Sequence, residues 1–242
     1  MARRSSGRLF FTVRRMARVG WAGALAACVL CLAVRGYAET LRGSVVFVPD
    51  GDTLVLDSGD VVRIQGVDTP EMGRDGAPDQ YFAREAREEL VALVLGQDVA
   101  VTTLGGAARD RYGRVLGSVA LADGQDVATL LVQGGCAFCY PHDDQPASLT
   151  GPLLAAQRRA MEAGAGFWPR VLALDAGGGQ WIGNRRSRRF HGPGSPQGRA
   201  VAAANRVVFS CLRAAFWEGF APARTSTPWP AARRQGRATM HD

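Results

Sequence analysis

The sequence predicts a small closed barrel of five β-strands covered by helices. Three observations support this class. Apolar residues alternate with a period close to two in five segments after Leu41, a helical pattern separates the third segment from the fourth, and two more helical patterns follow the fifth. Short strands of this number with few helices suit a sheet that closes on itself. With 47% hydrophobic and 21% charged residues, the chain can bury a core.

The five expected strands are 45–48, 53–57, 61–67, 97–104 and 115–121. Ser58-Gly59 is typical of a two-residue turn, which would join the second and third strands as a hairpin with Asp52 opposite Gln65. The first expected helix is 79–95, with Asp79 as its cap and Gly96 at its end. The other two are 127–132 and 152–163. The first of these ends at Gly134-Gly135 and the second at Gly164.

All 29 basic residues are arginine, which excludes every function that requires a lysine, and three histidines make a multi-histidine metal site a poor fit. Charge is divided unequally along the chain. Residues 39–170 hold 11 arginines and 19 acidic residues, a net charge of −8, whereas residues 171–242 hold 11 and 3, a net charge of +8. An acidic region is therefore followed by a basic one.

Residues 1–38 are typical of a signal peptide. Seven arginines and no acidic residue accompany an apolar run at 19–34, and Gly36-Tyr37-Ala38 fits a cleavage site. We expect cleavage after Ala38 and export of residues 39–242. The run is short for a retained membrane span of about 20 residues. Leu25-Ala26-Ala27-Cys28 leaves lipid anchoring at Cys28 as an alternative.

Cys136 and Cys139 form a C-x-x-C pair that would suit a small disulfide or redox exchange in an oxidising compartment. Their neighbours are mostly apolar, and cysteine in such surroundings behaves as a small buried hydrophobe. We favour the second interpretation.

Four carboxylates are expected at the open end of the hairpin: Asp50, Asp52, Asp68 and Glu71. Taken singly, Asp50-Gly51-Asp52 is also typical of a solvated turn, and Asp68 to Glu71 of a strand exit or helix cap. Taken together they supply the hard oxygen ligands that Ca²⁺ prefers.

Two arginines are expected near these carboxylates. Arg63 interrupts an apolar strand, and Arg114 closes the segment Asp110-Arg111-Tyr112-Gly113-Arg114. Arg63 could serve only to neutralise the acids, and Tyr112-Gly113 only to turn the chain. Two guanidinium groups beside a carboxylate-bound metal are also what phosphodiester cleavage needs, because they donate to the phosphate oxygens as negative charge develops.

These motifs, with the closing segment 164–168, resemble the staphylococcal nuclease (thermonuclease) family over residues 41–170. The resemblance implies an OB-fold barrel and Ca²⁺-dependent hydrolysis of DNA and RNA. It implies that Asp52, Asp68 and Thr69 bind one Ca²⁺, that Glu71 orients or deprotonates the attacking water, and that Arg63 and Arg114 grip the phosphate. It also implies nucleic-acid binding by Arg111, Tyr112 and Tyr140, although Arg111 stands where the family often has lysine.

Beyond the nuclease-like residues 39–170 we expect a linker at 171–180, a small module at 181–230 and a disordered tail at 231–242. The module resembles a Cys/His zinc module found behind some bacterial nucleases. Ser195, Ala223 and Ser226 occupy three ligand positions and only His191 matches, so we expect no zinc. A basic face at 185–189 would remain for nucleic acid.

The sequence thus predicts an exported, monomeric, Ca²⁺-dependent nuclease that acts on DNA, RNA or both, and it indicates no protein partner. The alternative is a catalytically silent OB-fold protein that binds nucleic acid. Such modules commonly lose an acidic residue or an arginine of the site, so the presence of all six implied residues favours the enzyme.

Overall fold

The computed structural model describes residues 39–103, 109–141, 147–224 and 229, all of which belong to one compact unit, Tyr37–Asp242. The expected signal peptide, the alternative lipid anchor at Cys28 and the tail at 231–242 lie outside the described residues. Within the described part of the chain, no helix has the length and apolar character to cross a membrane.

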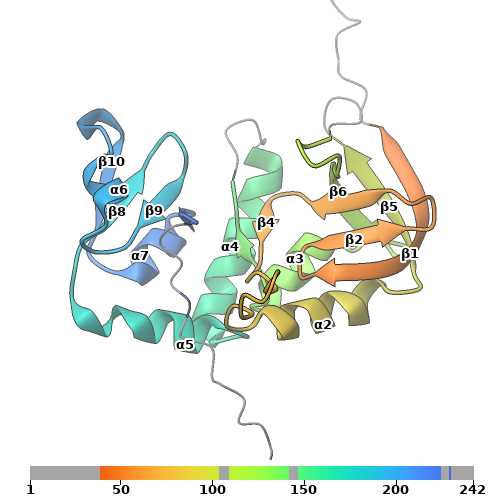
Figure 1. Cartoon of the computed structure of the whole chain (residues 1–242), viewed down its shortest axis with the longest axis horizontal. Helices are drawn as coiled ribbons and strands as arrows, with labels where there is room; N and C mark the ends of the chain where they lie inside the picture. The colour runs from red at the N-terminus through yellow and green to blue at the C-terminus, as the bar shows by residue number, and fades with distance from the viewer. Residues whose placement is uncertain (1–38, 104–108, 142–146, 225–228, 230–242) are drawn as a thin grey trace, which may run out of the picture. The chain divides into compact units, whose positions relative to one another are not determined.

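A closed barrel of five strands forms the first part of this unit (Figure 1). Around the barrel the strands are β1 (Thr40–Asp50), β2 (Thr53–Leu56), β3 (Val61–Ile64), β6 (Val115–Leu121) and β5 (Asp98–Thr103). All neighbours are antiparallel except the parallel pair β3 and β6. Alternate residues of β3, β5 and β6 are buried, as the period of two predicts, and they form the barrel core with buried residues of β1 and β2. The predicted five-stranded barrel is confirmed.

The turn between β2 and β3 has three residues, so the predicted two-residue turn is wrong. Leu56 N donates to Asp60 O at 3.0 Å, and Gly59 N donates to Leu56 O at 2.9 Å. Gly59 has a φ of +85°, the left-handed conformation that a three-residue hairpin loop requires. The register is consequently shifted by one residue. Ile64 N donates to Asp52 O, and Gln65 does not lie opposite Asp52.

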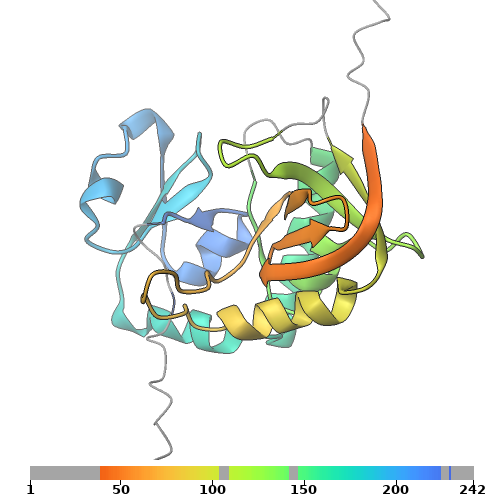
Figure 2. The ribbon, with the colours of Figure 1, turned by 45° about the vertical axis from the view of Figure 1, so that its right-hand side comes forward.

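Helix α2 (Ala83–Val94) packs against β1 along the side of the barrel (Figure 2). It begins four residues later than predicted, after Phe82, which has a φ of +70° and makes no side-chain cap. The prediction of Asp79 as the cap is wrong. The Asp79 carboxylate instead accepts hydrogen bonds from Gly73 N at 2.9 Å and from Arg84 Nε at 2.6 Å.

Helix α3 (Val127–Gln133) is capped by Asp126, which accepts from Thr129 N at 2.7 Å. It packs against α4 (Ala147–Ala163), which begins five residues before the predicted start at Pro152. Between them, β7 (Phe138–Cys139) pairs with β4 (Val67–Asp68). This short pairing places Asp68 opposite Phe138.

The structure buries both thiols of the C-x-x-C pair. Cys136 is 6% exposed and Cys139 is 2% exposed, and both belong to the core of the barrel and its helices. Burial raises the pKa of Cys136 to about 12 and that of Cys139 to about 11. High thiol pKa values and apolar surroundings support their interpretation as small buried hydrophobes.

The C-terminal module, defined here as residues 181–224 and 229, contains a second sheet. Its strand order is β10 (Arg206–Phe209), β8 (Trp181–Asn184), β9 (Arg189–His191) and β11 (Ala221–Pro222). Helix α7 (Leu212–Trp217) packs against β8 and β10, and the short α6 (Pro196–Arg199) and η2 (Ala203–Asn205) connect β9 to β10.

Two further short helices, α5 (Trp168–Leu172) and η1 (Ala173–Gly177), occupy most of the segment expected as a linker. Asp175 ties this segment to the module, because its carboxylate accepts from Trp181 Nε1 at 2.9 Å and from Leu212 N at 2.7 Å.

The C-terminal module packs directly on helix α4. Gln157 of α4 is fully buried, and its Nε2 donates to Phe216 O at 2.7 Å. Arg158 Nε donates to Trp217 O at 2.9 Å. The Phe216 ring lies 4.9 Å from the Trp168 ring and 5.9 Å from the Phe138 ring, measured between centroids. The module therefore shares an aromatic core with the residues that follow the barrel.

Candidate active site

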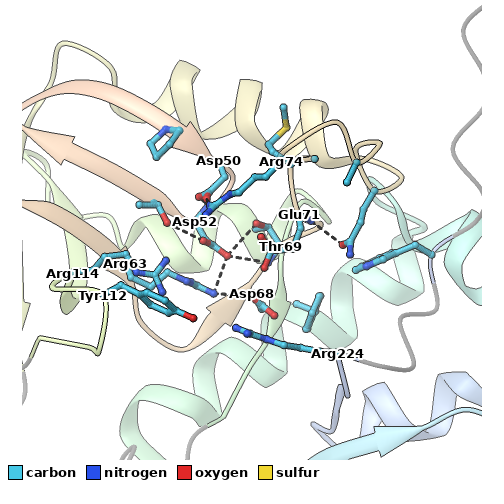
Figure 3. A pocket seen from close by; sticks show the side chains of 18 of the residues that line it. Asp50, Asp52, Arg63, Asp68, Thr69, Glu71, Arg74, Tyr112, Arg114 and Arg224 are labelled. Carbon is cyan, nitrogen blue, oxygen red and sulfur yellow. Dashed lines mark hydrogen bonds and ion pairs between the residues drawn. The ribbon is translucent and has the colours of Figure 1, made fainter. Parts of the chain in front are cut away.

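A pocket of about 760 Å³ opens beside the ends of β1, β2 and β3 (Figure 3). Its lining includes all six residues that the resemblance places in the catalytic and metal-binding groups: Asp52, Arg63, Asp68, Thr69, Glu71 and Arg114. The barrel thus brings together residues that are up to 62 positions apart in the sequence. Tyr112 lines the same pocket, whereas Arg111 and Tyr140 do not.

Asp52 is a buried carboxylate of the pocket, with 6% of the residue exposed. Its Oδ2 accepts from Thr69 N at 3.2 Å and from Thr69 Oγ1 at 3.1 Å. Gly51 permits this close packing, since a Cβ there would lie 2.9 Å from Thr69 Oγ1 and 3.0 Å from the Ala86 Cβ. The glycine before Asp52 is therefore required by the approach of two chain segments.

Arg63 stands between the carboxylates of Asp52 and Asp68. Its Nη2 lies 2.8 Å from Asp52 Oδ2 and 2.5 Å from Asp68 Oδ1, and its Nη1 donates to the backbone oxygens of Ile64 and Val67 (Figure 3). With 14% of its side chain exposed, the guanidinium neutralises the buried Asp52 and the partly exposed Asp68. A bound cation would compete with Arg63 for the same carboxylate oxygens.

Burial and mutual repulsion raise the pKa values of the carboxylates in the pocket. Burial raises the pKa of Asp52 to about 6; Arg63 opposes this rise, and Asp68 and Glu71 add to it. Burial also raises the pKa of Asp50, together with the charge of Asp52. Burial raises the pKa of Asp68 as well. Crowded acids of this kind favour a bound cation, because it would relieve their mutual repulsion.

The donor set fits a hard divalent cation. Asp52 and Asp68 supply carboxylate oxygens, and the pocket-lining Thr69 has a backbone carbonyl, so all three donors are the oxygen ligands that Ca²⁺ takes. Among the described residues, no group of three or more His, Cys, Asp or Glu side chains is already gathered in the manner of a metal site. The positions of the side chains around Arg63 would have to adjust for the cation to bind.

Glu71 is exposed at the rim of the pocket, and its main chain is fixed by Gln80. Glu71 N donates to Gln80 Oε1 at 2.8 Å, and Gln80 N donates to Glu71 O at 3.0 Å. These paired bonds fix the main chain of Glu71, whose solvent-accessible carboxylate lies in the same pocket as the buried ones. A group that exchanges a proton with a water molecule needs such access to solvent.

Arg114 reaches the pocket from the segment before β6, where Asp110 orients it. Its Nε and Nη2 lie 2.9 Å and 2.8 Å from Asp110 Oδ2. Tyr112 is 64% exposed. The guanidinium of Arg111 lies 4.8 Å from the centroid of its ring, and the guanidinium of Arg114 lies 5.5 Å from the same centroid. An exposed aromatic ring beside arginines can stack on a nucleobase.

Tyr140 lies apart from the pocket lining, and the guanidinium of Arg189 from the C-terminal module stands 3.3 Å from its ring centroid. Conversely, the pocket contains residues that the sequence did not single out. Arg74 lies 3.5 Å from Asp50, and Pro222, Arg224 and Trp229 of the module form part of the wall. No local motif marks these residues, and only the packing of the module brings Pro222, Arg224 and Trp229 to the barrel.

Known proteins resemble this chain over the segment that contains the site. The Staphylococcal nuclease homologue family matches residues 61–170. A protein of Escherichia coli named "Uncharacterized endonuclease" is 36% identical over 132 residues, which cover 53% of this chain and 77% of that protein. The chain belongs to the staphylococcal nuclease family.

Two further relatives of this nuclease-family chain have different names. The "Succinoglycan biosynthesis protein ExoI" of Rhizobium meliloti is 33% identical over 151 residues, which cover 60% of the chain and 74% of that protein. The "Probable endonuclease lcl3" of Emericella nidulans is 28% identical over 155 residues, with coverage of 60% and 51%.

The resemblance of the C-terminal residues to a Cys/His zinc module finds no support. The family match ends at residue 170. Ser195 caps the short helix α6 by accepting from Gly198 N at 3.3 Å, and Ala223 N donates to Phe190 O at 2.8 Å within the sheet region. These two positions serve the hydrogen bonding of the module, and Ser226 lies outside the described residues.

Proposed function

We propose that this chain is a Ca²⁺-dependent nuclease that hydrolyses phosphodiester bonds in DNA, RNA or both. The observation that carries the proposal is the convergence of Asp52, Asp68, Glu71, Arg63 and Arg114 on one pocket. The endonuclease names of several relatives support the reaction class. The silent binding protein remains the alternative, and a pocket built around buried acids argues against it, because carboxylates repel a polyanion that is only to be bound.

Asp52 and Asp68, with the carbonyl of Thr69, would hold the cation, which would polarise a phosphate oxygen. Arg63 and Arg114 donate to the phosphate oxygens, and their contacts strengthen as charge builds up in the transition state. Glu71 accepts a proton from the attacking water at its exposed carboxylate. Asp110 keeps the Arg114 guanidinium in position, and Gln80 keeps the main chain of Glu71 in position.

Substitution of the proposed catalytic groups tests this function. Arg114→Ala and Glu71→Gln should each lower kcat on single-stranded DNA by roughly 10²-fold or more, because each removes a contact made mainly in the transition state. Binding of the same DNA should change far less. Arg159→Ala is the matched control, since Arg159 is exposed on α4 and does not line the pocket. Unchanged kcat with weakened binding would support the silent binding protein.

The proposal extends to export, with residues 1–38 removed as a signal peptide, and to a monomer in solution. The protein recovered outside the cytoplasm should have the intact mass of a chain that begins at Glu39. Recovery of the full-length chain in the cytoplasm, or of a lipid-modified Cys28, would contradict this part.

A further inference from the structure

The far wall of the pocket comes from the C-terminal module, which lies outside the family match. Pro222, Arg224 and Trp229 line the same pocket as the carboxylates. The Trp229 ring lies 5.8 Å from the Phe138 ring and 5.4 Å from the Phe167 ring, measured between centroids. These contacts fasten the end of the module to the core beside the active site, while part of the indole stays exposed.

Arg224 is the cation of this wall. It is exposed, and Figure 3 shows its guanidinium end extended toward Asp68 and into the pocket. No ion pair or hydrogen bond to another described residue engages it. Arg63 and Arg114, in contrast, are already bonded to Asp52, Asp68 and Asp110. Arg224 is therefore the arginine of the pocket most available to an additional anionic group.

The charge of the chain is divided between an acidic nuclease part and a basic C-terminal part that contributes to this wall. Residues 39–170 carry a net charge of −8, which opposes the approach of a polyanion, whereas residues 171–242 carry +8. Part of that positive charge reaches the site. Burial raises the pKa of Asp68, and Arg189 of β9 is near enough to oppose that rise. The module thus supplies positive charge where the nuclease domain lacks it.

We propose that Arg224 and Trp229 form a second nucleotide subsite, in which Arg224 binds the phosphate next to the scissile one and Trp229 stacks on the adjoining base. The subsite rests on the proposed function, because the scissile phosphate is placed by Arg63 and Arg114. Its ligand is a strand with at least two consecutive phosphates. A guanidinium donates two hydrogen bonds to a phosphate, and an indole face stacks on any base, so the subsite is expected to tolerate all sequences.

Comparison of a long substrate with a short one tests the subsite. A twelve-residue oligothymidylate can fill it, whereas the dinucleoside monophosphate of thymidine has only the scissile phosphate. Arg224→Ala should lower kcat/KM on the twelve-mer about tenfold and leave kcat/KM on the dinucleotide unchanged. The salt dependence of twelve-mer binding should weaken by about one phosphate contact. Trp229→Ala should lower kcat/KM on the twelve-mer by a similar factor, and Trp229→Phe should restore most of it.

Arg213→Ala is the matched control, because Arg213 is an exposed arginine of the same module that does not line the pocket. It should leave both substrates unaffected. Equal losses on the two substrates with Arg224→Ala, or no loss on the twelve-mer, would overturn the subsite. If the wild-type protein cleaved neither these two substrates nor RNA in the presence of Ca²⁺, the proposed function would fail. Fluorescence anisotropy with labelled twelve-mer would then decide the subsite alone, since Arg224→Ala should still weaken binding about tenfold.

Discussion

Replacing Gln157 by leucine tests whether the C-terminal module is an integral part of the fold. Gln157 is fully buried on α4, where its Oε1 accepts from Cys139 N and its Nε2 donates to Phe216 O, both at 2.7 Å. Leucine has a similar size and no polar atoms, so the substitution removes both bonds without leaving a large cavity. The loss of its hydrogen bond costs a different free energy at each of the two backbone partners.

Cys139 N would be left as a buried donor without its acceptor, which costs about 1–3 kcal/mol. Phe216 O keeps the hydrogen bond from Gly219 N at 2.9 Å, so its loss is a single bond worth about 0.5–1.5 kcal/mol. Together, Gln157→Leu should lower the free energy of unfolding by about 2–4 kcal/mol. For a chain of this size the Tm should fall by roughly 5–15 °C.

Urea unfolding followed by tryptophan fluorescence and by circular dichroism measures this loss. The midpoint should fall while the slope m stays constant, and the two probes should report one transition, because α4 contributes buried residues to both the barrel core and the aromatic core of the module. Arg159→Leu, at an exposed position of the same helix, should change stability by less than about 0.5 kcal/mol. A loss below about 1 kcal/mol for Gln157→Leu, or separate transitions, would refute the reasoning.

Three further outcomes follow from particular residues. Gly135→Ala should destabilise the protein by at least twice the roughly 1 kcal/mol of Gly124→Ala in thermal unfolding, because both glycines have positive φ but only a Cβ at Gly135 meets a backbone oxygen, Ala165 O, at 2.3 Å. Without divalent cations, the contribution of Asp52 to stability should fall as pH rises from about 4 to about 6, since burial raises the pKa of Asp52 from 3.8 to about 6 and the folded chain favours the protonated carboxyl. The unfolding free energy of the wild type, from urea titrations at several pH values, should therefore decrease relative to that of Asp52→Asn across this range. Iodoacetamide at pH 8 should leave Cys136 unmodified in the folded protein, which peptide mass mapping checks, because burial raises its pKa to about 12.

Local patterns in the sequence predicted the barrel and the composition of the site. Alternation of apolar residues defined the five strands, and the carboxylates before and after the β2–β3 hairpin had to meet at its open end whichever turn joined the strands. The turn itself was harder to predict, because Ser58-Gly59 suits both a two-residue and a three-residue loop, and only the hydrogen bond from Leu56 N to Asp60 O distinguishes them.

Contacts between distant segments could not be predicted in the same way. Asp79 is a plausible cap by its position, but it accepts hydrogen bonds from Gly73 and Arg84, which depends on how the preceding loop folds back. Nucleic-acid binding by Tyr140 stays a prediction, and the contact of its ring with Arg189, 49 positions along the chain, has no signal in the sequence. Arg224 reaches the pocket only through the packing of the whole module, for which the sequence carries no local signal.

Cation-dependent cleavage tests the central claim most directly. Purified protein should be incubated with single-stranded DNA, plasmid DNA and RNA in Ca²⁺ or in EGTA, and the initial rates compared with those of Asp52→Asn, which removes a proposed cation ligand. The account predicts cleavage of at least one substrate in Ca²⁺, its loss in EGTA with recovery on adding excess Ca²⁺, and a rate at least 10²-fold lower for Asp52→Asn. Equal rates in Ca²⁺ and EGTA, or full activity of Asp52→Asn, would contradict it.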